Sequence, residues 1–101
     1  MNLETLNQFN KREFCRLFGL YVKRQKVMLN LTSDKIAEAT GMTLKEVKMI
    51  ESGRKRLSQN EFETIVSTMQ MDSGEILNLS KITHVENILN FLREIDVFFQ
   101  R

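Results

Sequence analysis

The chain has 101 residues, of which 42% are hydrophobic and 28% are charged, and its formal net charge is +2. These values are typical of one soluble globular domain, and no apolar run approaches the roughly 18 residues of a membrane span. Because Cys15 is the only cysteine, a disulfide within the chain and a zinc site built on cysteines are both excluded.

The small net charge hides a segregation along the chain. Residues 10–60 hold 12 Lys and Arg against 5 Asp and Glu, whereas residues 61–101 hold 3 against 7. A basic first half predicts that a polyanion docks on one face, and the alternative is a solvated surface with chance clustering. The start of the chain, MNLETLNQFNKREF, lacks the pattern of a signal peptide, so we expect a cytoplasmic protein.

The first predicted helix begins after Asn10, which is placed to cap it, with Glu13 completing a capping box. It ends at Asn30, a residue type that tolerates the left-handed conformation of a helix exit. Helical spacing gives this segment one buried stripe, made of Phe14, Leu17, Phe18, Tyr21, Val22 and Met28.

Two short helices follow, joined by a sharp turn. Thr32 opens the first of them, and Gly41 follows it where the turn requires a positive φ angle. Thr43 and Glu46 form a capping box that opens the second. The inner faces of both helices are made of Ile36, Ala37, Thr40, Val47 and Ile50.

Further capping pairs, each three residues apart, open the remaining helices: Ser58 and Glu61, Asp72 and Glu75, and Thr83 and Glu86. The Asp72 pair frames a short fifth helix, which ends near Leu79, and the Thr83 pair opens a separate last helix. No stretch alternates as a strand does, and the chain has no proline and four glycines. We therefore expect an all-α protein, organised as a single domain over residues 1–101.

The stretch LTSDKIAEATGMTLKEVKMIESGRKRLS, followed by FETIVSTMQMDSGEIL, resembles the lambda-repressor-like family of helix-turn-helix proteins, also called the Cro/C1 or Xre type. The resemblance spans about residues 14–79 and rests on five features taken together: Ile36-Ala37, Gly41, Val47, Ile50-Glu51 and Gly53. It implies a five-helix DNA-binding core within residues 10–79, whose recognition helix 43–51 enters the major groove of operator DNA.

The resemblance also implies which residues meet the DNA: Thr32, Ser33, Thr43, Leu44, Lys45, Glu46, Lys48, Met49, Arg54, Lys55 and Arg56. The last three are expected to clamp phosphates, and Lys23 and Arg24 extend the basic rim. Ser33 stands where the family usually has a longer glutamine. A structural pair is implied between Lys26 and Glu51, and it is weaker than usual because lysine lacks the bidentate fork of arginine.

Several of these residues have a second interpretation. Lys45 and Lys48 are either merely solvated or in contact with DNA, and Lys45 opposes the helix dipole. Glu46 is either only a cap or a reader of cytosine, and Leu44 meets either a neighbouring loop or a thymine methyl group. His84 and Cys15 have no partners for catalysis or metal binding, so we expect no enzyme, no metal and no cofactor.

The segment 80–101 adds a helix beyond the family's five. Its apolar residues cover two adjacent faces, which predicts packing on the domain and on a second copy at once. The residues expected at this dimer interface are Ile88, Phe91, Leu92, Ile95, Phe98 and Phe99. The alternative is that the helix folds only over its own domain, together with Leu3, Leu6 and Phe9.

These patterns predict a sequence-specific transcription regulator, a bacterial or phage repressor that binds duplex DNA as a homodimer. One alternative is an antitoxin or a restriction–modification controller of the same fold, whose last helix holds a partner protein such as a toxin. Another alternative is a protein-interaction adaptor that has lost DNA binding, against which the basic loop 54–56 argues.

Overall fold

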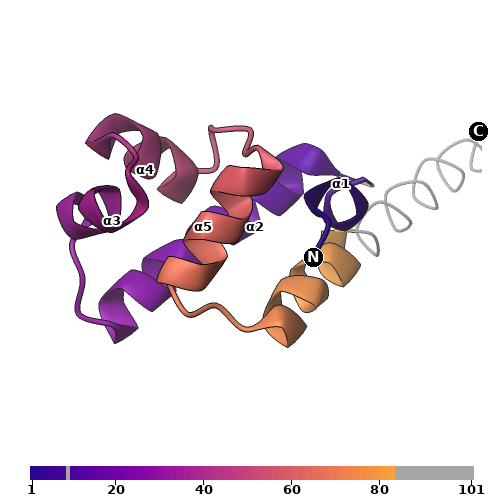
Figure 1. Ribbon diagram of the computed structural model, residues 1–101. Coiled ribbons are helices and arrows are strands. Elements are labelled where there is room, and N and C mark those ends of the chain that lie inside the picture. The colour runs from indigo at the N-terminus through magenta and orange to yellow at the C-terminus, as the bar shows by residue number, and fades with distance from the viewer. Residues whose placement is uncertain (9, 84–101) are drawn as a thin grey trace, which may run out of the picture.

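The computed structural model describes residues 1–8 and 10–83, and the regular structure in these residues is entirely helical. The labelled helices are α1 (Leu3–Leu6), α2 (Lys11–Met28), α3 (Ser33–Thr40), α4 (Leu44–Glu51) and α5 (Gln59–Thr68). A further helix runs from residue 73 to residue 83, where the described part ends, and we call it the 73–83 helix (Figure 1). The expected all-α class is therefore confirmed for the described residues.

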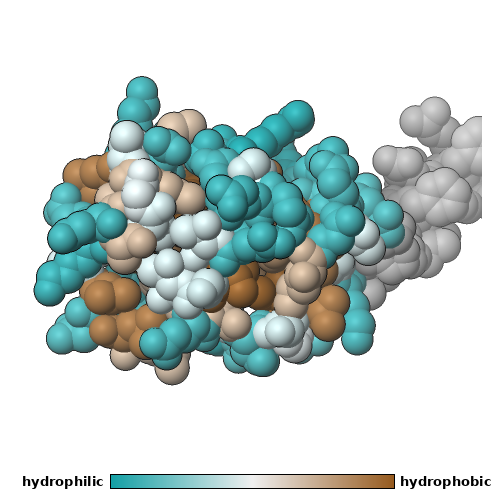
Figure 2. All heavy atoms as spheres, in the orientation of Figure 1, coloured by the Kyte–Doolittle hydropathy of each residue, from teal (hydrophilic) through white to brown (hydrophobic). Residues whose placement is uncertain are grey.

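The core forms where α2 and α5 meet. Phe14, Phe18 and Val22 of α2 have no exposed surface, and the ring of Phe18 lies 5.3 Å from that of Phe62 of α5. The two short helices α3 and α4 pack on each other, with α4 also against α2 and α3 against α5. Hydrophilic residues cover most of the face of the molecule seen in Figure 2. The amphipathic stripes thus close one core and leave the polar faces outside.

The predicted helix boundaries before residue 70 agree with the structure. The side chain of Asn10 accepts a hydrogen bond from the backbone of Glu13, and Asn30 adopts the left-handed conformation with φ 54°. Capping boxes open α4 and α5 at Thr43 and Ser58. The carboxylate of Glu13 pairs with Arg16, whose hydrogen bond lowers the pKa of Glu13.

The short helix α1 is an element that the sequence patterns did not predict. Leu3 and Leu6 are buried, and the backbone N–H of Leu3 donates to the side chain of Gln59 over 2.8 Å. The hydroxyl of Ser80 donates to the carbonyl of Leu6 over 2.6 Å. This helix has only four residues and would not be stable alone, so contacts with both α5 and the 73–83 helix hold it in place.

Two expectations about helices are wrong. The predicted break between a fifth helix and a last one is absent, because the 73–83 helix continues through residues 80–83. Thr83 is fully buried at the end of its described part, and its hydroxyl donates to the carbonyl of Ser80. Met28, expected on the buried stripe, is 69% exposed because α2 ends there, beyond the helices that cover its inner face.

The expected dimer residues and His84 lie outside the described residues. Of the helices in residues 1–8 and 10–83, none is long and apolar enough to cross a membrane.

Candidate nucleic-acid interface

The helix α4 is mounted on the core through one face. Val47 and Ile50 are buried, as predicted, and they hold α4 against the rest of the domain. On the opposing helix α2, a Cβ atom added to Gly19 would lie 2.4 Å from the carbonyl oxygen of Ile50. The two backbones therefore approach more closely than any other residue allows. Gly19 sets how α4 sits on the domain, and the outer face of α4 projects into solvent.

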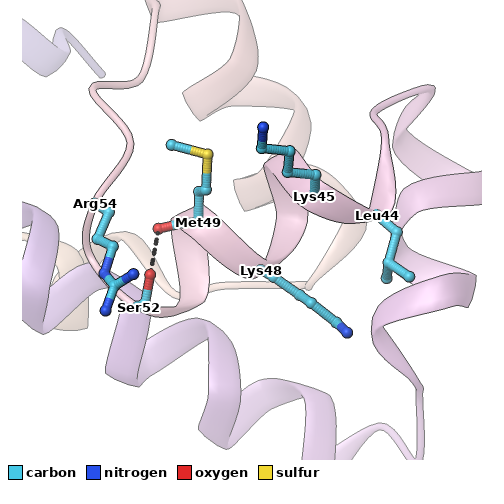
Figure 3. A pocket seen from close by; sticks show the side chains of 6 residues that line it. All are labelled: Leu44, Lys45, Lys48, Met49, Ser52 and Arg54. Atoms are coloured by element: carbon cyan, nitrogen blue, oxygen red, sulfur yellow. Dashed lines mark hydrogen bonds between the residues drawn. The ribbon is translucent and has the colours of Figure 1, made fainter.

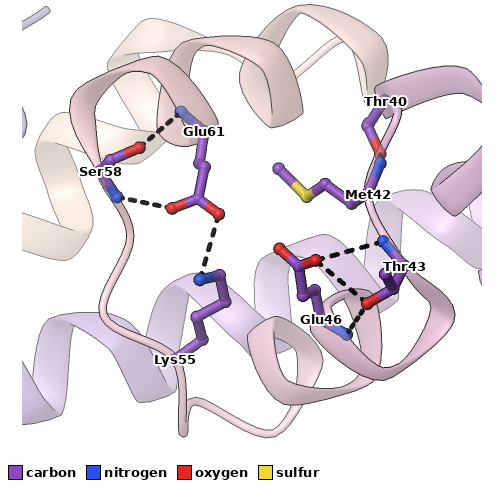
Figure 4. Close-up of polar contacts among 7 residues, drawn as sticks. All are labelled: Thr40, Met42, Thr43, Glu46, Lys55, Ser58 and Glu61. Atoms are coloured by element: carbon purple, nitrogen blue, oxygen red, sulfur yellow. Dashed lines mark hydrogen bonds and ion pairs between the residues drawn. The ribbon is translucent and has the colours of Figure 1, made fainter.

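The turn before α4 and its first residues are locally determined. Gly41 has φ 73°, and a Cβ atom there would meet nothing within 4 Å, so the backbone conformation alone favours glycine. Thr43 accepts a hydrogen bond from the backbone of Glu46 and donates to its carboxylate, each over 3.1 Å (Figure 4). The polar groups of Thr43 and Glu46 therefore bind each other. These contacts favour the interpretation of Glu46 as a helix cap over that of a reader of cytosine.

The outer face of α4 carries a shallow groove, which we call the α4 groove. It is lined by Leu44, Lys45, Lys48, Met49, Ser52 and Arg54. Figure 3 shows Lys45 and Lys48 extending from the helix backbone, and the hydroxyl of Ser52 donates to the carbonyl of Met49 over 3.1 Å. The groove thus combines cations with two apolar side chains, Leu44 and Met49, which are half-buried.

The cations of the α4 groove take part in none of the ion pairs found among the described residues. These cations, Lys45, Lys48 and Arg54, are exposed. Lys45 lies in the first turn of α4, where the helix dipole disfavours positive charge by about 0.3–1 kcal/mol. An anion or a hydrogen-bond acceptor placed on this face would offset that cost.

Ser33 belongs to a network that joins α2, α3 and α4. The ammonium of Lys26 lies 2.9 Å from Oε1 of Glu51, and it also donates to the hydroxyl of Ser33 over 3.2 Å. That hydroxyl in turn donates to the Glu51 carboxylate. Glu51 is only 7% exposed, so these donors offset the cost of burying its charge. Ser33 therefore stabilises the packing of the three helices, and its single proton is already in use.

The three basic residues of the loop after α4 differ in their contacts. Lys55 is half-buried and pairs with Glu61 over 3.1 Å (Figure 4). Arg54 and Arg56, by contrast, are exposed. The backbone N–H of Ser58 and the nearby Lys55 lower the pKa of Glu61 against the opposing effect of burial. Lys55 therefore anchors the loop to the start of α5, and the two arginines remain available to a ligand.

Other predicted rim residues differ in their availability. Arg24 pairs with Glu75 of the 73–83 helix, and its guanidinium lies 4.5 Å from the centre of the Tyr21 ring. Lys23 is exposed. Thr32 is also exposed, but its hydroxyl accepts from the backbone of Lys35 as the cap of α3. Arg24 thus ties two helices together instead of extending the rim.

Two features of this region were missed in the sequence patterns. Lys11 and Arg12, in the first turn of α2, lie beside the loop 53–56. Two adjacent cations at a helix start are unfavourable with the dipole, and that signal was readable in the sequence. Gly19 was equally readable, because a glycine inside an amphipathic helix costs about 1 kcal/mol and needs a packing reason.

Metal-ligating and nucleophilic side chains are the remaining groups to place. The described residues include no group of three or more metal-ligating side chains. Cys15 is half-buried, and its burial raises the pKa of the thiol, which favours the neutral form. Compared with family models, with curated proteins and with solved structures, the chain gives no match.

Proposed function

We propose that this protein binds duplex DNA in a sequence-specific manner and acts as a transcription regulator. The observation that carries the proposal is the α4 groove, in which Lys45, Lys48 and Arg54 are exposed without ion-pair partners among the described residues. The groove lies on a helix that the core holds in place through Val47, Ile50 and Gly19. A protruding helix with a cationic outer face suits the major groove of B-DNA, which admits an α-helix.

The contacts of each side chain suggest how the work is divided. Lys45 and Lys48 have free donors for guanine edges, and Leu44 and Met49 offer apolar surface to a thymine methyl group. Arg54 and Arg56 bind phosphates and set the register. The polar groups of Ser33, Glu46 and Lys55 are bound within the protein. These three residues therefore orient the side chains that contact the bases.

We infer that α2 to α5 and the 73–83 helix are the five helices of a lambda-repressor-like domain, with α1 as an addition. The protein acts as a cytoplasmic repressor and as a homodimer, joined through Ile88, Phe91, Leu92, Ile95, Phe98 and Phe99, which lie outside the described residues. The alternative is a controller or antitoxin of the same fold whose last helix binds a toxin.

The test is a selection of bound sites from random duplex DNA, followed by affinity measurements by fluorescence anisotropy. We expect an enriched sequence, and affinity that falls steeply between about 50 and 200 mM salt, since each neutralised phosphate contributes about 0.9 to the log–log slope. Equal affinity for the selected and the scrambled duplex would contradict base reading. Binding that is flat with salt, or absent, would contradict DNA binding altogether.

A further inference from the structure

A second concave surface lies beside the α4 groove, between the start of α2 and the loop after α4. This pocket, of about 370 Å³, is lined by Lys11, Arg12, Cys15, Gly53, Arg54, Lys55 and Arg56. We call it the basic pocket. Five of its seven lining residues are cations, and none is acidic. Its charge comes from two segments that lie about 40 residues apart in the sequence, so the tertiary structure brings them together.

Gly53 is what brings the loop onto α2. Its φ angle is 74°, and a Cβ atom at this position would lie 2.7 Å from the Cα atom of Arg16. Any other residue would push the loop outward and open the pocket. The close approach therefore fixes Arg54 and Arg56 beside Lys11 and Arg12.

The charges of the basic pocket are only partly compensated. Lys55 pairs with Glu61, and Lys11 lies 3.9 Å from an exposed Glu4, a pair of little energetic weight. Arg12 and Arg56 form no ion pair in the part of the chain that the structure describes. Like charges so close together repel one another, and Lys11 and Arg12 also oppose the dipole of α2. A bound anion would relieve both effects.

We propose that the basic pocket binds a phosphate group of the DNA backbone, next to the base pairs that α4 contacts. Arg54 lines both the basic pocket and the α4 groove, so the two surfaces are continuous. A duplex lying along α4 therefore passes the start of α2. This inference rests on the proposed function, and it adds Lys11 and Arg12 to the residues that hold the DNA.

The chemistry of the pocket suits a phosphodiester. Guanidinium groups donate paired hydrogen bonds to phosphate oxygens, and Arg12 and Arg56 are both available for this. Cys15 adds no competing negative charge, since a half-buried thiol stays protonated. The contact would not recognise any base, and it would fix the register of the domain along the duplex.

The experiment uses the full chain and the selected duplex, in which each phosphate in turn is replaced by a neutral methylphosphonate. Wild-type protein should lose about ten-fold in affinity at one flanking phosphate, the effect of a charge-assisted hydrogen bond. The double variant Lys11→Ala, Arg12→Ala should bind the unmodified duplex about ten-fold more weakly and lose nothing further at that phosphate, while its other sensitivities persist. Its salt slope should fall by about 1.

Lys81→Ala is the control, because Lys81 is exposed on the 73–83 helix and lies outside both concave surfaces. It should behave as wild type at every phosphate. Thermal melting followed by circular dichroism checks that all variants fold. A double variant with the wild-type pattern of phosphate sensitivity would overturn the inference and leave the proposed function intact.

A titration with inorganic pyrophosphate, followed by NMR shifts of the Lys11, Arg12 and Gly53 amides, separates the remaining outcomes. One outcome is that only the wild type binds pyrophosphate saturably, while the double variant keeps the DNA affinity of the wild type. The pocket would then bind a free phosphate compound, and the assignment to the DNA backbone would be overturned. If the wild type binds no DNA, the proposed function fails first, and the inference fails with it.

Discussion

At the scale of single residues, the structure separates side chains that serve the fold from those left for a ligand. Thr43, Glu46 and Lys55 were all expected at the DNA, yet each makes a polar contact inside the protein. Lys45 and Lys48, on the same short helix, make none among the described residues. The free donors of these two lysines are therefore the best candidates for base recognition.

We predict that Lys45→Ala lowers affinity for the selected duplex by about 1–3 kcal/mol and relaxes the preference at one base pair. The fold should be unaffected, because the variant removes a charge that opposes the α4 dipole. Anisotropy with the selected duplex and with all single-base variants of it measures both effects. Lys81→Ala, which removes one charge elsewhere, should leave the preference unchanged. A uniform loss over all duplexes would place Lys45 on phosphate.

At the scale of helices, the position of α4 depends on close backbone contacts. Gly19 lies against the carbonyl oxygens of Ile50 and Glu51, where an added Cβ atom would be 2.4 Å and 2.7 Å away. The partly buried network of Lys26, Ser33 and Glu51 also joins α2 to α4, and it includes α3. Backbone contact and buried polar contacts together determine how far α4 projects.

We predict that Gly19→Ala lowers the free energy of unfolding by about 1–3 kcal/mol, because backbone atoms must move to admit the methyl group. The gain of about 1 kcal/mol in helix propensity is too small to offset that. Urea unfolding followed by circular dichroism measures it. Gly74→Ala is the matched control, since its Cβ atom would meet only the flexible side chain of Asp72, at 3.2 Å. A Gly19→Ala variant at least as stable as wild type would refute the argument.

For the molecule as a whole, one cluster of buried side chains joins the described helices. Its buried side chains run from Leu3 of α1 to Ile76 of the 73–83 helix, and α1 packs on α5. The apolar residues Leu77 and Ile82 of the 73–83 helix remain 47% and 46% exposed. The described part of the 73–83 helix therefore leaves apolar surface exposed.

We predict that deletion of residues 84–101 gives a folded monomer that binds DNA only weakly, whereas the full chain is a dimer. Each apolar side chain buried at a dimer interface contributes about 1.5–3 kcal/mol, which the truncated chain would lose. Light scattering gives the mass and circular dichroism gives the helix content. A truncated chain that is still dimeric places the interface elsewhere, and one that unfolds makes the last helix part of the core.

Features that depend on neighbours within one or two helical turns are predictable from the order of the residues. The caps at Asn10, Thr43 and Ser58 need only a side chain and a backbone N–H a few residues on. The turn at Gly41 needs only a residue that tolerates a positive φ angle. The inward face of α4 follows from helical spacing, because Val47 and Ile50 lie three residues apart.

Features that depend on residues distant in the chain become visible once the helices are packed together. Serine is a residue type that is common at protein surfaces, so the sequence does not show that Ser33 is structural. Its hydroxyl donates to the carboxylate of Glu51 only because α3 and α4 pack side by side. The sequence pattern predicts a helix break before Thr83, whereas in the described residues the helix is continuous and the Thr83 hydroxyl donates to the carbonyl of Ser80. The basic pocket exists because Gly53 lets the loop approach Arg16, which places Lys11 and Arg12 beside Arg56. Such contacts join segments that are far apart in the sequence and are brought together by the packing of the helices. They therefore produce no regular spacing of residues that a sequence pattern could reveal.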